Sequence, residues 1–387
     1  MKVVVVGAGI GGLLAAKVLA EAGHTVTVVE KSAEIGAVGA GITLAANANA
    51  ILSALKLDVR PRGLRLEQME LVDTDDRVLS ALPPPGAQDE PGGIYAFHRA
   101  ELHEALLAGL PSGVVFQLGR ALATVEVGDA AVRLVFEQGS DEVADLVIGA
   151  DGAHSRVRPA VGGERPLEYS GQTCWRTVVD VELGVRGVEV FGRAGCRFGV
   201  IPLRGGRTYL FLVSPAPERA PTPEWSSFTQ RFGGMGGLTE RVFPRIQPDR
   251  LLHHDLGALP EPVWGQPRVW LLGDAAHAMT PNLGQGASMA IEDVAALALH
   301  LPGTLSADQL PDAHRAYVGR RDSRVRQVLS ASRRFGSLAT WSDPRAVWLR
   351  NGLMRLTPEA ANRKAQASLV APGLALAQEL RELKERG

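Results

Sequence analysis

Two glycine-rich segments, far apart in the chain, carry the residues best suited to binding a phosphorylated ligand. The first runs Gly7-Ala8-Gly9-Ile10-Gly11-Gly12 and fits the pattern G-x-G-x-x-G. The first glycine of such a pattern permits a tight turn, the second lets the backbone approach a pyrophosphate, and the third allows close helix–strand packing. Free N–H groups at the start of the following helix then stabilise the phosphates. This segment predicts a dinucleotide site.

An acidic residue follows these glycines at the distance expected for ribose recognition. Glu30 comes 18 residues after Gly12, where a carboxylate accepts hydrogen bonds from ribose hydroxyls. The same charge would repel a 2′-phosphate, so the tightly bound nucleotide is not expected to be NADP. The pattern by itself does not distinguish FAD from NAD.

The second segment begins at Asp274, directly after the apolar residues 269–272 and Gly273. Ligands bind at the carboxyl ends of strands in open α/β sheets. A loop containing Gly284 and Gly286 then leads into an apolar stretch with helical character. The N-terminus of that helix would stabilise negative charge at the other end of a long dinucleotide. The alternative is a capped helix that binds no ligand.

The elements that would position these residues follow from hydrophobic periodicity. Residues 3–6, 13–20 and 25–29 predict one strand–helix–strand unit, with strands buried on both faces. Further strands are expected at 121–127, 132–137, 145–148 and 268–272, an antiparallel sheet over 169–213, and helices at 287–300 and beyond 308. Stretches rich in proline and glycine predict loops at 83–86 and 91–93.

Length and composition exclude several classes of protein. The 387 residues suggest two or three domains, and the net charge of −1 creates no global field that would favour nucleic acid or an anionic membrane. Two cysteines, Cys174 and Cys196, are too few for a disulfide scaffold or a multi-cysteine zinc site, and no metal site is expected. No stretch of about 18 apolar residues is present to span a bilayer. We therefore expect a cytoplasmic enzyme.

Taken together, the motifs resemble those of the FAD-dependent aromatic hydroxylases, the single-component flavin monooxygenases, over nearly the whole chain. The glycine pattern with Glu30 is the first motif. Residues 145–158, DLVIGADGAHSRVR, are similar to the family's Asp-Gly motif, and Gly273-Asp274 with its loop is similar to the Gly-Asp motif. Residues 282–293 look most like the branch of urate hydroxylases and zeaxanthin epoxidases, which act on a purine and a carotenoid ring. The third motif therefore indicates how the flavin is bound and does not identify the substrate.

The resemblance implies an α/β fold in which two domains are interleaved and the C-terminus is helical. A Rossmann-like FAD-binding domain is expected from residues 1–70, 97–165 and 266–310, and a mostly antiparallel β-sheet substrate domain from 71–96 and 166–265. Residues 311–387 are expected to form a helical region. Within it, 374–383 would be either an amphipathic dimerisation helix or a helix packed on its own chain. A monomer or homodimer is expected.

The resemblance also implies roles for individual residues toward FAD. Asp274 would hydrogen-bond the ribityl chain, and Arg99 would lie near the FAD phosphates unless it is a surface helix charge. Asp151 would serve both FAD and NAD(P)H unless it only caps a turn. His277 could be a metal ligand or base by residue type, but no second ligand is spaced near it, so the sequence predicts a part of the loop scaffold. The expected cofactor-binding set is Gly7, Gly9, Gly11, Gly12, Glu30, Lys31, Thr43, Arg99, Asp151, Asp274, Pro281, Gly284, Gln285, Gly286, Ala287 and Ser288.

Arg197 and Tyr209 match an arginine and a tyrosine that the urate hydroxylases use against their anionic heterocycle. A guanidinium stabilises an oxyanion, and a phenol orients it or relays a proton. A two-residue hairpin at Gly205-Gly206 would, however, set Tyr209 opposite Pro202 and leave Arg197 on the other face. Only a bulge or a longer loop would bring both into one pocket, and otherwise Arg197 is a cross-strand surface residue. Trp175 and Arg176 are further pocket candidates.

The resemblance implies a monooxygenase that hydroxylates a small aromatic or heteroaromatic substrate. NAD(P)H would reduce FAD, O₂ would add at flavin C4a, and the hydroperoxide would transfer one oxygen. The alternatives are an epoxidase of a cyclic alkene, an FAD-dependent reductase or dehydrogenase without oxygen insertion, and a catalytically idle flavoprotein. The sequence leaves the substrate, and the choice of NADH or NADPH, open.

Overall fold

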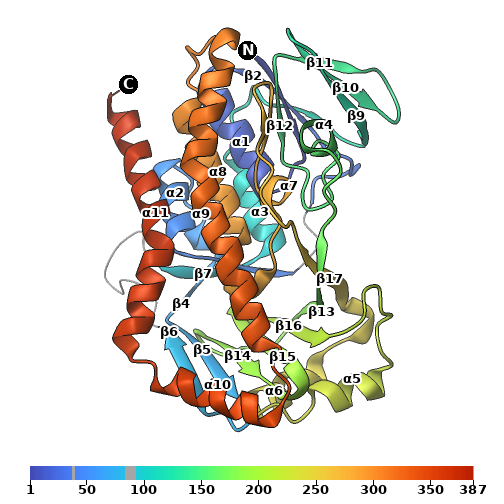
Figure 1. Ribbon diagram of the computed structural model, residues 1–387, viewed down its shortest axis with the longest axis vertical. Helices are drawn as coiled ribbons and strands as arrows, with labels where there is room; N and C mark the ends of the chain where they lie inside the picture. Colours follow the sequence, from blue (N-terminus) through green and yellow to red (C-terminus); the bar gives the residue numbers. More distant parts are fainter. Residues whose placement is uncertain (37–39, 83–92, 387) are drawn as a thin grey trace.

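The computed structural model describes residues 1–36, 40–82 and 93–386, and shows an α/β protein built around two main sheets (Figure 1). The loops predicted at 83–86 and 91–93 lie, apart from Gly93, outside these residues. A six-stranded sheet occupies one half of the molecule and a seven-stranded sheet the other. The expected fold class, with its helical C-terminus, is confirmed.

The six-stranded sheet holds the predicted strand–helix–strand unit at its centre. Its order is β18-β19-β12-β1-β2-β8, in which β18 is the antiparallel edge strand. The strands are β1 Lys2–Val6, β2 Thr25–Val29, β8 Val115–Gln117, β12 Leu146–Gly149, β18 Gly265–Gln266 and β19 Val269–Leu271. The central strands β1 and β2 are valine-rich and buried except at their first residues, as is typical of parallel strands covered on both faces.

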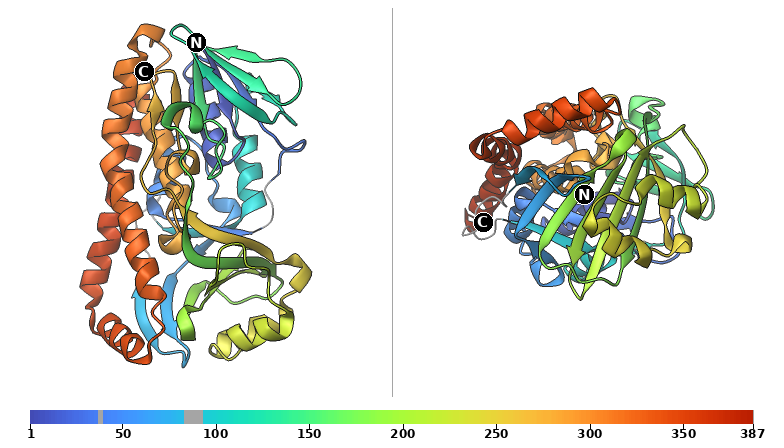
Figure 2. Two further views of the ribbon diagram at one scale, coloured as in Figure 1. Left: turned by 45° about the vertical axis from the view of Figure 1, so that its right-hand side comes forward. Right: turned by 90° about the horizontal axis from the view of Figure 1, so that it is seen from below.

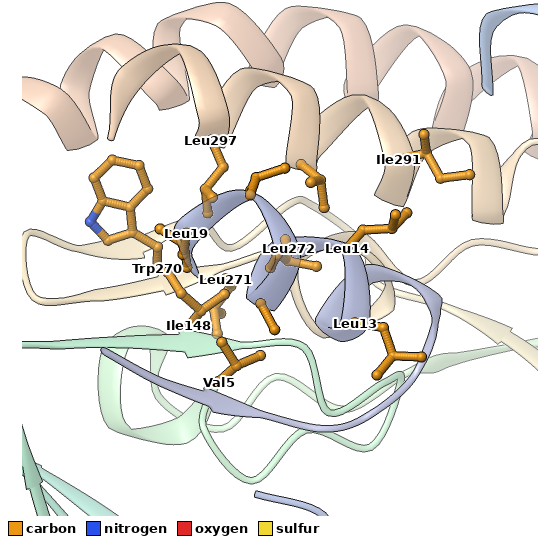
Figure 3. Packing of buried hydrophobic residues seen from close by; sticks show 14 of the residues in the cluster. Val5, Leu13, Leu14, Leu19, Ile148, Trp270, Leu271, Leu272, Ile291 and Leu297 are labelled. Carbon is orange, nitrogen blue, oxygen red and sulfur yellow. The ribbon is translucent and has the colours of Figure 1, made fainter. Parts of the chain in front are cut away.

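Helix α1 (Ile10–Glu21) is enclosed between this sheet and helix α8 (Gly286–His300) (Figure 3). Leu14 and Leu19 of α1 pack between strand residues such as Val5 and the α8 residue Leu297. The tight packing brings the N-terminal turns of the two helices to the carboxyl edge of the sheet. A smaller sheet of β9 (Leu122–Val127), β10 (Val132–Phe136) and β11 (Glu142–Ala144) lies beside it, and β11 is a strand that the sequence analysis missed.

The seven-stranded sheet is mostly antiparallel and has two different faces. Its order is β17-β13-β16-β15-β14-β5-β6, from β5 Gln68–Asp73, β6 Val78–Leu82, β13 Glu168–Val179, β14 Arg186–Phe191, β15 Arg197–Leu203, β16 Arg207–Pro215 and β17 Leu252–Ala258. Helices α5 (Trp225–Phe232) and α6 (Gly237–Val242) cover one face through an aromatic cluster. The opposite face packs on the small sheet of β3 (Gly41–Leu44), β7 (Ile94–His98) and β4 (Leu64–Leu66).

The C-terminal helices run along both halves (Figures 1 and 2). Helix α9 (Leu310–Ala339) spans the length of the molecule, α10 (Pro344–Leu356) crosses the end below the second sheet, and α11 (Glu359–Arg386) returns to pack on α2 (Ala46–Ala54). The stretch 374–383 therefore packs on its own chain. Within the described ranges, no helix is both long and apolar enough to cross a membrane. The interleaved division into three parts remains a proposal.

Candidate active site

The glycine-rich loop is tightly packed on one side and open on the other. Gly7 has a φ of +102°, and a Cβ atom on it would lie 2.5 Å from the Ala150 carbonyl oxygen. A Cβ atom on Gly12 would lie 1.9 Å from the Gly7 oxygen. No described atom lies within 4 Å of the corresponding position on Gly9. The open side is where the backbone would meet a pyrophosphate.

This contrast predicts that two glycine-to-alanine changes affect different properties, one the stability of the protein and the other its affinity for FAD. Gly12→Ala should destabilise the FAD-free protein, because the new methyl group would force backbone atoms apart. Gly9→Ala should leave the unfolding midpoint of the FAD-free protein unchanged, yet weaken FAD binding at least tenfold. Urea denaturation and titration with FAD measure the two quantities. Equal effects of both changes on stability would contradict the assignment of the open side to the ligand.

Glu30 is built into the glycine loop. Its Oε2 accepts a hydrogen bond from Ala8 N–H (2.9 Å) and its Oε1 accepts one from Ser32 N–H (3.0 Å). Partial burial disfavours the charged form, but these hydrogen bonds outweigh it and hold the pKa of Glu30 below its ordinary value. The carboxylate therefore braces the loop, and its contact with a ribose remains a prediction. Lys31 follows it on the surface.

Asp274 stands where the second motif leaves the sheet. It begins the short helix α7 (Asp274–His277) after Gly273, whose φ of +58° turns the chain sharply. Its side chain is reached by solvent although protein surrounds it closely, which is the situation of a residue lining a recess. This environment raises the pKa of Asp274, while His277 and Arg99 act in the opposite direction. A Cβ atom on Gly286 would lie 4.0 Å from Asp274 Oδ1, so Asp274 stands beside the start of α8.

The first turns of α1 and α8 lie side by side. A Cβ atom on Gly11 of α1 would lie 3.6 Å from Ala290 Cβ of α8. Thr43 of β3 lies beside the loop before α8, since a Cβ atom on Gly284 would lie 3.5 Å from Thr43 Oγ1. No side chain of the described residues caps either helix, so their N–H groups stay available. Two uncapped N-termini at one sheet edge create a region of positive potential that suits an extended anion.

Buried polar atoms without partners mark the same region. Asp151 Oδ2 accepts hydrogen bonds from the N–H groups of Arg156 (2.6 Å) and Val157 (3.2 Å), whereas its Oδ1 finds no partner in the part of the chain that the structure describes. Ser288 Oγ, in the first turn of α8, is likewise without one there. Burial raises the pKa of Asp151. These groups, the open loop and the two helix N-termini fit a ligand that carries phosphates, hydroxyls and a polar ring edge, as FAD does.

The remaining residues of the second loop hold positions around α8. Pro281 begins a short 3-10 turn, Pro281–Leu283, and is exposed. Gln285 is buried, and its Oε1 accepts a hydrogen bond from Asn47 Nδ2 (3.3 Å). Ala287 is half-buried in the first turn. Their expected contacts with FAD, like those of the other cofactor-binding residues, remain predictions.

A buried ionic group beneath Asp274 fixes the loop, and the sequence analysis did not find it. Asp293 of α8 accepts hydrogen bonds from Gly273 N–H (2.8 Å) and His277 Nε2 (2.6 Å) through Oδ2, and from Arg321 Nε (2.7 Å) through Oδ1. His277 thus acts as loop scaffold, as expected. An acidic pair, Glu292 and Asp293, inside an otherwise apolar helix was the available signal.

Positive charge gathers on the face of the seven-stranded sheet that looks toward Asp274. Arg176 of β13 donates to His254 Nδ1 of β17 (3.1 Å), and its Nε is buried without a partner among the described residues. Arg99, the first residue of α3 (Arg99–Ala108), is reached by solvent although protein surrounds it closely. This environment lowers the pKa of Arg99, nearby Arg176 lowers it further, and Asp274 and Tyr209 act against this. Burial raises the pKa of Tyr209, so its phenol is protonated at neutral pH. Sequence reasoning missed His254, because β17 contains none of the recognised motifs.

The hairpin that carries Arg197 and Tyr209 differs from the simple prediction. Leu203 pairs with Arg207 and Ile201 with Tyr209, so the turn has three residues, with Gly205 and Gly206 at positive φ. The two-residue turn was wrong, and the longer turn shifts the register by one residue. Arg197 and Tyr209 therefore share one face of the sheet.

Arg197 nevertheless contacts protein groups. It is buried and donates to Glu189 Oε1 (3.1 Å), Gln172 Oε1 (3.1 Å) and Asn282 Oδ1 (2.8 Å). Asn282 belongs to the loop that follows Asp274, so Arg197 joins the second sheet to that loop. The catalytic roles expected for Arg197 and Tyr209 remain predictions.

Trp175 does not line this region, and that prediction was wrong. Successive residues of a strand point to opposite faces, and Trp175 lies on the other face from Arg176. It packs edge-on against Phe228 and Phe232 of α5 and stacks on His253. Arg176, its neighbour, is the pocket candidate that the structure brings to the site.

Comparison with known proteins identifies the family of this chain. The FAD binding domain family matches residues 1–332. The chain is 36% identical over 384 residues to the 2-heptyl-3-hydroxy-4(1H)-quinolone synthase of Pseudomonas aeruginosa, covering 95% of this chain and 97% of that protein. It is 33% identical to the aurachin C monooxygenase/isomerase of Stigmatella aurantiaca, covering 92% and 94%.

A solved structure has the same overall fold. The structure of Klebsiella pneumoniae HpxO complexed with FAD and uric acid matches with a TM-score of 0.87 at 26% identity, covering 96% of this chain and 97% of that one. FAD and NAD(P)H are accordingly the cofactor and co-substrate here, and the alternatives without aromatic oxygenation are not favoured. The chain belongs to the FAD-dependent aromatic hydroxylases and is a flavoprotein monooxygenase.

Proposed function

We propose that this monooxygenase hydroxylates a planar nitrogen heteroaromatic of the 4-quinolone type, at the ring carbon next to the one that bears oxygen. The observation that carries the proposal is the Arg176 guanidinium, paired with His254 and with its Nε unsatisfied, beside the protonated phenol of Tyr209. A relative that matches 95% of this chain bears the name of a hydroxyquinolone synthase, which supports this substrate class. Another, which matches 92% of it, bears the name aurachin C monooxygenase/isomerase, which supports oxygenation.

Bound FAD, reduced by NAD(P)H, supplies an electrophilic oxygen atom from O₂. The chain's own task is to make the ring carbon nucleophilic and to keep water out. Arg176 and Tyr209 donate hydrogen bonds to the ring oxygen and stabilise its anionic form, in which the adjacent carbon carries more electron density. His254, whose pKa is lowered by burial and by Arg176, stays neutral and orients that guanidinium through Nδ1.

Beside these groups, the same face of the sheet continues into an apolar cluster. Ile201 and Leu203 are buried there against Leu66 and Ala96 of the small sheet, and Val178 and Phe211 pack against them. Asp274 and Arg99 border the same space on the side of the FAD-binding residues. A flat ring between these groups would present its edge to Arg176 and Tyr209.

The test is a substrate panel with the FAD-loaded enzyme. We expect 2-heptyl-4(1H)-quinolone to accelerate NAD(P)H oxidation and to yield a product with one added oxygen and little peroxide. Uric acid and 3-hydroxybenzoate should not be oxygenated. Coupled oxygenation of uric acid would redirect the proposal to purines, and acceleration without O₂ uptake would overturn the monooxygenase assignment.

Arg176→Met tests the role of the guanidinium in this reaction. Loss of a hydrogen bond to a charged group costs about 1.5–3 kcal/mol, so kcat/KM should fall about 10- to 150-fold while FAD remains bound. Arg186→Met is the matched control, because Arg186 lies on the same sheet with its side chain 58% exposed. A kcat/KM unchanged by Arg176→Met would contradict the role.

We also propose a cytoplasmic location and a monomeric or homodimeric state, with small molecules and O₂ as the reaction partners. The near-neutral net charge supports a protein that does not bind nucleic acid.

A further inference from the structure

Helix α10 presents its most apolar residues to solvent. Trp348 is 78% exposed, Leu349 50%, Leu353 58% and Leu356 80%. Leu349, Leu353 and Leu356 follow Arg345 at spacings of four, four and three residues, and Trp348 comes three residues after Arg345, so all five share one face of the helix. These four are among ten large hydrophobic side chains that are exposed within the described residues. Such a concentration on one short helix marks a site of interaction.

The opposite face of α10 fixes its rotation. Arg350 is buried, donates to the Leu338 carbonyl oxygen (3.2 Å) and lies 5.0 Å above the ring of Phe191. Met354 packs on the small cluster that contains Phe191. Near the C-terminus of α10, Arg355 pairs with Asp73 (3.0 Å). These contacts hold one face of α10 against the protein, so the opposite, apolar face points to solvent.

The segment that carries this face is rich in basic residues, although Arg350 and Arg355 are engaged on its other side. Residues 331–364 contain seven Lys or Arg and two acidic residues, a net charge of +5 in a chain whose total is −1. No acidic residue occurs between 344 and 358, and Arg345 stands within the apolar face itself. Trp and Leu on one face with basic residues beside them are typical of helices that lie in a membrane interface.

We propose that α10 is an interfacial helix that binds the protein to the surface of an anionic lipid bilayer. Trp348 and the three leucines would enter the boundary between headgroups and acyl chains, and Arg345 would pair with lipid phosphates. The helix crosses one end of the molecule, far from both chain termini, so a flat surface can approach it (Figures 1 and 2). The contact is peripheral and involves no membrane span.

A second copy of this chain fits the face less well. A standard interface between proteins buries roughly 800 Å² per partner, and four partly exposed side chains on a helix of 13 residues supply less than that. A symmetric contact would also bring the basic residues of two copies together. Charge and area therefore both favour a lipid surface.

The experiment is cosedimentation of the FAD-loaded protein with vesicles of phosphatidylcholine containing about one-third phosphatidylglycerol. We expect binding that weakens with added salt, and a blue shift of tryptophan emission from Trp348. The double change Leu353→Glu and Leu356→Glu should reduce partitioning at least tenfold, and Arg345→Glu should reduce it severalfold. Trp348→Phe should keep binding and lose the blue shift.

Leu383→Glu is the matched control, because Leu383 is a 50% exposed leucine of α11. It should leave partitioning unchanged, and retained flavin absorbance and circular dichroism show that each variant is folded. The proposal is overturned if the wild type does not bind, if it binds pure phosphatidylcholine equally well, or if the double change has no effect. A wild-type dimer that the double change converts to monomer would instead assign the face to a second copy.

Discussion

Asp293→Ala is expected to lower the free energy of unfolding by about 3–5 kcal/mol, because it leaves buried Arg321 without one of its two carboxylate partners. Gly273 N–H and His277 would lose their acceptor at the same time. Urea denaturation of the FAD-free protein at pH 7 measures the change. Asp312→Ala is the matched control, since Asp312 pairs with Arg315 on the exposed surface of α9 and should cost no more than about 1 kcal/mol.

The same group predicts a pH dependence. Burial alone would raise the pKa of Asp293, but His277 and Arg321 outweigh it and hold the pKa below its ordinary value. Its stabilisation is therefore fully present above about pH 4, the pKa in the unfolded chain, and is lost as the pH falls through the lower folded-state pKa. The difference in stability between wild type and Asp293→Asn should shrink only in that acidic range. A difference that changes between pH 6 and pH 8 would point to another group.

Asp274→Ala is the second change with a large expected effect. If Asp274 accepts hydrogen bonds from the ribityl chain of FAD, losing them costs about 1.5–3 kcal/mol, which raises the dissociation constant of FAD about 10- to 150-fold. NAD(P)H-dependent oxygenation should fall in parallel and recover in part with excess FAD. Titration of the FAD-free protein followed by flavin fluorescence measures the affinity directly.

Asp274→Asn provides the control for charge, because the amide keeps one acceptor in the same place. It should weaken FAD binding less than the alanine change. Urea denaturation of the FAD-free form should be almost unaffected by either change, since the side chain of Asp274 is reached by solvent. Unchanged oxygenation by Asp274→Ala without added FAD would contradict the proposed role.

Local patterns were sufficient for much of the FAD-binding half. Continuous valine runs predicted β1 and β2, the periodic stretch after the glycines predicted α1, and the segment after Asp274 predicted α8. These elements depend on interactions between residues close in sequence, and nearly every residue of the two strands is buried. The short strand β11 was missed because three residues carry too little periodicity to be recognised.

By itself, then, the sequence determined the family, the cofactor and the positions of both glycine-rich segments, because turn geometry and helix N-termini arise from local residue types. Only the tertiary structure decided which side chains meet in the site. One extra residue in the turn before Arg207 set the face on which Tyr209 lies. Pairing of β13 with β17 brought Arg176 to His254, and packing of α9 on α8 brought Arg321 to Asp293. Strand register and helix packing join residues far apart in the chain, and no local pattern encodes those distances.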